Sequence, residues 1–246
     1  MALAFALVLS LVAATSFISG IFGVAGGLIL MGGLVYLLPV SQAMIVHGVA
    51  QFVSNGSRVY FWRQHLAIDI ILKFALTSFL CLGAFAFLRF VPSKTLVLFL
   101  LGISTVVLFF VPDRWAPRIT QRGVAYGTGA AATALMLMAG VSGPFLDQFF
   151  VRSGLDRRVT IATKAAMQCV SHIVKIAYFG ALAGNGLDEE WWLLAGLAPF
   201  AAVAGSSAAA PVLHRMTDKQ FYWWTRRIVL VLGVYYIVEA IRSWLA

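Results

Sequence analysis

Two segments of this sequence repeat one polar pattern, Gln-x-x-Ser-(Asn/His)-x-x-(Arg/Lys), inside otherwise apolar stretches. The first copy runs from Gln51 to Arg58 and the second from Gln168 to Lys175. A basic or titratable residue also stands four residues before each copy. At about 100° per residue, the polar positions of each copy fall on one stripe of a helix. Amide, hydroxyl, imidazole and cationic groups on such a stripe donate hydrogen bonds, which is the chemistry that binds an anion.

The two stripes supply most of the candidate binding residues. These are Gln51, Ser54, Asn55, Arg58, Lys164, Gln168, Ser171, His172 and Lys175. A charged group inside a membrane costs at least about 2.5–3.5 kcal/mol on insertion scales, so charged residues there are functional candidates. The alternative is that Arg58 and Lys164, each about one turn from an expected helix end, extend their charges to the membrane interface. Lys175 fits that alternative least, because it lies near the middle of its expected helix.

Two glycine-rich interruptions form a second candidate feature. They lie at residues 20–27 (Gly-x-x-Gly-x-x-Gly-Gly) and 140–144 (Gly-x-Ser-Gly-Pro). Glycine and proline break a helix there and free backbone polar groups, which is tolerated when they are buried in protein or face a water-filled cavity. Helix ends at such breaks direct N–H groups at an anion, so we add Gly26, Gly27, Ser142 and Gly143 to the candidate substrate-binding residues. The alternative is close helix packing, since small residues are common where membrane helices meet.

Three titratable residues could couple substrate movement to protons. They are His47 and His172, which titrate near neutral pH, and Asp147, which follows the second interruption and could take up a proton or pair with a stripe lysine. Nothing in the sequence requires such coupling. We expect no cofactor and no metal site, because Cys81 and Cys169 lie in separate predicted helices without vicinal partners.

The composition places all of these residues in a membrane. Hydrophobic residues make up 61% of the 246 residues and charged residues 11%, and the mean hydropathy is +0.93. No soluble domain of this size needs so much apolar surface, so we expect an integral membrane protein. The net charge of +9 does not indicate a nucleic-acid partner, because most Lys and Arg fall in short loops, where they set membrane orientation. The first cation is Arg58, so the N-terminus lacks the basic flank of a signal peptide, and we expect it to be retained.

Six segments have the length of a complete helical crossing of the bilayer. They are 41–62, 67–90, 93–111, 158–183, 191–212 and 222–245. Two further segments, 3–38 and 120–151, are too long for one crossing and carry the interruptions. If both enter and return as re-entrant hairpins, the loop cations divide more unequally between the two sides than if both cross. The positive-inside rule therefore favours the hairpins.

The hairpin arrangement predicts two repeats of opposite orientation in an all-α integral membrane protein. The first repeat (1–112) and the second (119–246) each consist of a broken, re-entrant hairpin and three transmembrane helices. Such inverted-topology repeats are typical of secondary transporters that bind their substrate at the membrane midplane between the repeats. Both termini are then expected on the outer side of the membrane.

A different class of protein is suggested by one short motif. Residues 140–143 read Gly-Val-Ser-Gly, and His172 lies on the next predicted helix. This resembles the nucleophile motif of rhomboid intramembrane proteases, in which a Ser–His dyad performs acyl transfer, here with Ser142 and His172. A four-residue match is a weak signal, and a protease has no use for a duplicated cationic stripe.

The chain resembles the TauE/SafE family of bacterial membrane proteins, described as sulfite and organosulfonate exporters. The resemblance rests on residues 19–27 (Ser-Gly-Ile-Phe-Gly-Val-Ala-Gly-Gly), on Pro39 before the second crossing, and on the weaker second copy from Gly140. The chain departs from the family pattern at residues 144–147 (Pro-Phe-Leu-Asp), which replace a glycine run, and at His47 and Asn55. The resemblance implies transport of a small sulfur oxyanion or sulfonate across a bacterial cytoplasmic (inner) membrane, and the outer side, where both termini are expected, is then the periplasmic side.

These observations predict a secondary transporter, not an enzyme, that moves a small anion such as sulfite, thiosulfate or a short sulfonate. Alternating access would come from the two repeats rocking around the midplane site. The expected partners are the anionic substrate and the lipid bilayer. The sequence leaves the transport direction, the coupling ion and a homo-oligomeric state open.

Overall fold

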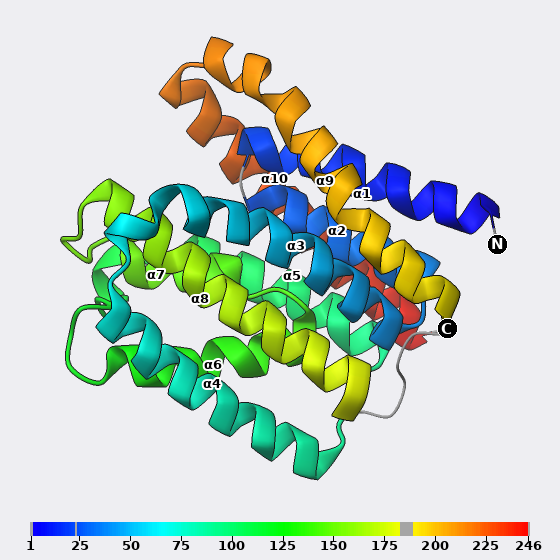
Figure 1. Cartoon of the computed structure of the whole chain (residues 1–246), viewed down its shortest axis with the longest axis horizontal. Helices are drawn as coiled ribbons and strands as arrows, with labels where there is room; N and C mark the ends of the chain where they lie inside the picture. Colours follow the sequence, from blue (N-terminus) through cyan, green and yellow to red (C-terminus); the bar gives the residue numbers. More distant parts are fainter. Residues whose placement is uncertain (1, 23, 183–188, 246) are drawn as a thin grey trace.

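The structure is a computed structural model that describes residues 2–22, 24–182 and 189–245, and these residues form helices and connecting loops with no strand (Figure 1). The helices are α1 (Ala2–Phe22), α2 (Val24–Leu37), α3 (Val40–Trp62), α4 (Ile68–Leu88), α5 (Lys94–Phe110), α6 (Val124–Ala139), α7 (Gly143–Phe150), α8 (Arg157–Ala177), α9 (Glu189–Arg215) and α10 (Asp218–Leu245). A π-helical turn, Tyr178–Leu182, continues α8. Position 183, the last residue of one predicted crossing, lies outside the described residues.

Several helix boundaries follow from local sequence chemistry. Pro39 precedes α3, where its fixed φ and missing N–H suit a helix start. The Ser93 hydroxyl accepts a hydrogen bond from the Leu96 N–H and caps α5. Asp156 caps α8 in the same way, and the backbone N–H of Arg158 donated to its carboxylate lowers the pKa of that carboxyl.

Five of the described helices are long and apolar enough to cross a membrane: α1, α4, α8 with its π-helical turn, α9 and α10. With this composition the chain is a multi-pass membrane protein. Helix α3 has 23 residues, which is the length of a crossing, but it is not among the five because its stripe of polar side chains lowers its hydropathy. The second arm of each interrupted segment is short, with 14 residues in α2 and 8 in α7. The first arm of segment 3–38 is not short, because α1 alone has the length of a full crossing.

Helices α6 and α7 form a hairpin whose two ends lie at the same place. The Ile119 N–H donates to the Phe149 carbonyl at 2.9 Å, and the Thr120 hydroxyl donates to the Ser153 carbonyl at 3.2 Å. At the tip, Gly140 ends α6 with φ of 79°, a left-handed conformation that favours glycine. Segment 120–151 therefore enters the bundle and returns to the loop from which it started.

The helices pack so that α3 and α8 lie side by side at the centre of the bundle (Figure 1). Around this pair, α1 packs against α9, α4 against α6, and α5 against α10. The main apolar core joins α2, α3, α5 and α9. Helix α1 begins and α10 ends at one end of the bundle, and the loops after α3, α5, α7 and α9 lie at the other end (Figure 1).

Candidate functional site

Helices α3 and α8 run antiparallel and bring the two polar stripes together. Gly48 packs against Ile176, the Cys169 thiol lies 3.8 Å from the Phe52 carbonyl, and Arg158 lies over the Trp62 ring. These contacts pair the start of each helix with the end of the other. The predicted stripes therefore face one space from opposite sides.

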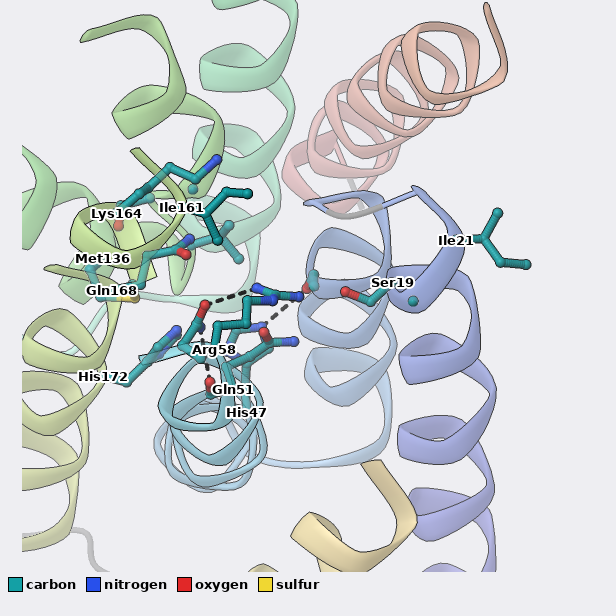
Figure 2. A pocket seen from close by; sticks show the side chains of 16 residues that line it. Ser19, Ile21, His47, Gln51, Arg58, Met136, Ile161, Lys164, Gln168 and His172 are labelled. Carbon is teal, nitrogen blue, oxygen red and sulfur yellow. Dashed lines mark hydrogen bonds between the residues drawn. The ribbon is translucent and has the colours of Figure 1, made fainter. Parts of the chain in front are cut away.

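That space is a cavity of about 430 Å³ (Figure 2). Ten of the residues proposed from the sequence line it: Gly27, His47, Gln51, Asn55, Arg58, Ser142, Gly143, Lys164, Gln168 and His172. Six further lining residues were not proposed: Ser19, Gly20, Ile21, Met136, Val141 and Ile161. Ser19 and Gly20 adjoin the first glycine interruption, which was an available signal. The apolar members carry no sequence signal that distinguishes them from core residues.

On α3, hydrogen bonds within the stripe position the single arginine of the cavity. Asn55 is buried, its amide donates to the Gln51 carbonyl at 2.9 Å, and its side-chain oxygen accepts from Arg58 Nη1 at 3.0 Å. His47 Nε2 lies 3.1 Å from the Gly27 carbonyl of α2. The α3 stripe is therefore fixed both within its own helix and to the first interruption.

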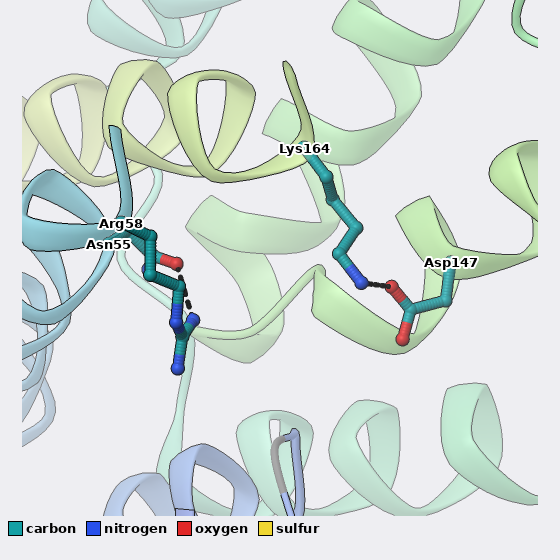
Figure 3. A network of polar contacts seen from close by, with 4 residues as sticks. All are labelled: Asn55, Arg58, Asp147 and Lys164. Atoms are coloured by element: carbon teal, nitrogen blue, oxygen red, sulfur yellow. Dashed lines mark hydrogen bonds and ion pairs between the residues drawn. The ribbon is translucent and has the colours of Figure 1, made fainter. Parts of the chain in front are cut away.

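On α8, the cavity wall includes an ion pair and a buried imidazole. Lys164 Nζ lies 2.6 Å from Asp147 Oδ1 of α7, with both side chains half-buried (Figure 3). His172 is buried, and its ring centroid lies 5.8 Å from that of His47. Its Nδ1 is covered from water and has no hydrogen-bond partner among the described residues, which costs about 1–3 kcal/mol for a buried polar atom.

The tip of the α6–α7 hairpin closes another side of the cavity. Ser142 occupies the position before α7 and is fully buried, and within the described part of the chain its hydroxyl has no hydrogen-bond partner. Gly143 begins α7 beside it. Both residues line the cavity, although the Ser142 hydroxyl oxygen itself is covered from water.

Lys175 does not line the cavity, although it lies close behind it. It is fully buried, and its Nζ lies 2.7 Å from His47 Nδ1 and 2.9 Å from the Gly140 carbonyl. This arrangement assigns Nδ1 of His47 as an acceptor and its Nε2–H as the donor to Gly27. Lys175 therefore ties α8 to α3 and to the end of α6.

Three other proposed residues also lie outside the cavity lining. A side chain at Gly26 would collide with the Thr15 carbonyl, so this glycine allows α1 and α2 to pack closely. Ser171 is buried and donates to the Met167 carbonyl of its own helix. Ser54 lies on α3 but does not line the cavity.

The cavity offers a cation, amides, imidazoles and a hydroxyl, which suits an anion that only accepts hydrogen bonds. No group of three or more His, Cys, Asp or Glu side chains suited to a metal ion occurs within the described ranges. No curated protein and no solved structure matches the chain. The family described as Sulfite exporter TauE/SafE matches residues 7–236. With nearly its whole length matched, the chain belongs to the TauE/SafE family and is a membrane transporter.

Proposed function

We propose that this protein is a secondary transporter of a small sulfur oxyanion or organosulfonate, bound in the cavity between α3 and α8. The observation that carries the proposal is the set of hydrogen-bond donors on the cavity wall, which are the guanidinium of Arg58 and the side-chain amides of Gln51 and Gln168. An anion in this space accepts hydrogen bonds from the guanidinium and the amides.

The packing of the helices supports an inverted repeat of α1–α5 and α6–α10. In such a repeat α1 corresponds to α6, α2 to α7, α3 to α8, α4 to α9 and α5 to α10. When each helix is replaced by its counterpart, the α1–α9 contact becomes the α6–α4 contact and the α3–α9 contact becomes the α8–α4 contact, and both members of each pair are present. The α3–α8 and α5–α10 contacts each join a helix to its own counterpart. This is the pattern expected of a pseudo-two-fold axis that passes between α3 and α8.

Alternating access then requires the two repeats to separate at one end and close at the other. Arg58 lies near the end of α3 and Lys164 near the start of α8, and both line the cavity. The loops after α3 and α7 lie at this end of the bundle (Figure 1). At the other side of the cavity, Lys175 of the second repeat contacts His47 of the first. These contacts support a state that opens toward the loops richest in Lys and Arg, which the positive-inside rule places in the cytoplasm, with both termini outside.

A protein-stability screen tests the substrate class. Purified protein in detergent is heated with sulfite, thiosulfate, methanesulfonate and sulfoacetate, and with carboxylates of similar size. A ligand at a hundred times its Kd stabilises the folded state by about 2.7 kcal/mol, so sulfur anions should raise the melting temperature more than the carboxylates. Equal shifts for both sets would remove the assignment to sulfur anions.

The protease alternative is not supported by the geometry of the hairpin tip. A Ser–His dyad needs an imidazole nitrogen within hydrogen-bond reach of the serine hydroxyl, and among the residues that the structure describes the Ser142 hydroxyl has no such partner. Ser142→Ala provides a direct comparison, because it would abolish proteolysis but should weaken anion binding by only the contribution of one hydroxyl.

A further inference from the structure

The two cations that line the cavity are held in different ways. Lys164 extends toward Asp147 of α7 and forms an ion pair with it at 2.6 Å (Figure 3). Arg58 donates instead to the neutral amide of Asn55, and among the described residues no carboxylate lies within ion-pair distance of its guanidinium. One lining cation is therefore neutralised by the protein, and the other is left for a ligand.

The remaining polar groups of the lining do not change this count. Gln51, Asn55 and Gln168 are neutral amides. His47 accepts a hydrogen bond at Nδ1, which keeps its ring neutral, and no carboxylate among the described residues forms an ion pair that would favour an imidazolium at His172. Lys175 directs its Nζ at the Gly140 carbonyl and His47 rather than into the cavity. The lining and the adjacent Asp147 together thus carry one net positive charge while Asp147 is ionised.

We infer that Asp147 determines the charge of the transported anion: the cavity prefers a monoanion, such as a sulfonate or hydrogensulfite, to a dianion. A monoanion matches the uncompensated guanidinium of Arg58. A dianion would need the ammonium of Lys164, for which the Asp147 carboxylate competes, and it would also be repelled by that carboxylate. This inference rests on the proposed anion site and adds the charge class of its substrate.

Removing the charge of Asp147 should reverse the preference. In Asp147→Asn the ammonium of Lys164 is released, and the lining gains one unit of positive charge. A second negative charge on the ligand then meets an attractive group at close range in a partly desolvated site, where charge interactions are strong. We expect dianion affinity to rise at least about tenfold relative to monoanion affinity, which corresponds to about 1.4 kcal/mol.

Methanesulfonate and sulfate are suitable probes, because they are similar tetrahedral anions with one and two charges at neutral pH. Their affinities are measured by calorimetry on the full-length protein in detergent at constant ionic strength. The matched control is Asp69→Asn, which removes the acid of another Asp–Lys pair, with Lys73, on the exposed face of α4. Lys164→Gln and the double variant Asp147→Asn/Lys164→Gln complete the set.

The wild type and Asp69→Asn should bind methanesulfonate at least tenfold more tightly than sulfate, and Asp147→Asn should lose or invert this ratio. Lys164→Gln should weaken both anions at least tenfold, and the double variant should recover methanesulfonate binding, because the net charge returns to that of the wild type. The double variant also provides the test if Asp147→Asn alone does not fold.

Two results would overturn the inference while leaving the anion site intact. One is a change of equal size for both anions in Asp147→Asn. The other is a folded double variant that binds methanesulfonate no better than Lys164→Gln does. A wild-type protein that binds neither probe and no other sulfur anion overturns the proposed function itself, and the charge selection with it.

Discussion

Arg58 is the residue whose removal should affect anion binding most. Its guanidinium lines the cavity and is fixed by the hydrogen bond to Asn55 Oδ1 at 3.0 Å. Arg58→Gln keeps a hydrogen-bonding side chain but removes the charge. Arg58→Lys keeps the charge but loses the planar fork that can bind two oxygens of a sulfonate together.

The size of the effect follows from the type of contact that is lost. A hydrogen bond to a charged group contributes about 1.5–3 kcal/mol, so Arg58→Gln should weaken methanesulfonate binding by about tenfold to a hundredfold. Arg58→Lys should lie between Arg58→Gln and the wild type. Because the guanidinium is partly buried at the site, the loss should persist at high salt better than an effect of exposed surface charges, which are screened.

Calorimetric titration of each purified variant with methanesulfonate measures this loss. Arg63→Gln is the matched control, because Arg63 follows the same helix, is exposed, donates to the Tyr60 carbonyl and lies over the Tyr60 ring, outside the cavity lining. Thermal unfolding of the unliganded proteins checks that both variants remain folded. A folded Arg58→Gln protein with an affinity within threefold of Arg63→Gln would refute the role of this cation in binding.

Three further predictions concern the frame of the site. Lys175→Met should lower the melting temperature, because His47 Nδ1 and the Gly140 carbonyl each lose a buried hydrogen-bond partner at about 1–3 kcal/mol. It should reduce anion affinity less than Arg58→Gln does. A larger loss of affinity in Lys175→Met than in Arg58→Gln would show that the lysine contacts the substrate. Gly26→Ala should destabilise the fold by about 1–3 kcal/mol through overpacking. In Gly27→Ala the added methyl group would face Gln51 at ordinary contact distance, so this variant should change the anion affinity more than the free energy of unfolding. Single cysteines in loops 112–119 and 152–158, introduced after replacement of the native cysteines, should react from the same side of the membrane; labelling from opposite sides would contradict the hairpin.

The sequence was informative where a pattern is local to one helix. The stripe spacing placed Gln51, Asn55 and Arg58 on one face of α3, and the turn at Gly140 falls where glycine and proline interrupt the hydrophobic run. Such features depend on helical periodicity and backbone propensity, which a single segment determines by itself.

Contacts between segments were harder to predict, because they depend on how the helices rotate and shift against one another. The spacing alone put Lys175 on the same stripe as Lys164, yet packing directs one toward His47 and the other toward Asp147. Gly26 and Gly27 are adjacent and chemically identical, but only Gly27 faces the cavity, because α1 covers the other. The pairing of Lys164 with Asp147 was one of two options in the sequence, and the structure selects it.

The polar face of α3 also bears on how the protein is assembled. Because of its stripe of polar side chains, α3 is not among the described helices that are apolar enough to cross a membrane unaided. Its partner α8 follows in the chain only after α4, α5, α6 and α7. During synthesis α3 must therefore be held by α2 and α4, or by the insertion machinery, until α8 arrives. Mutations that weaken α8 should thus lower the yield of inserted protein as well as its transport rate.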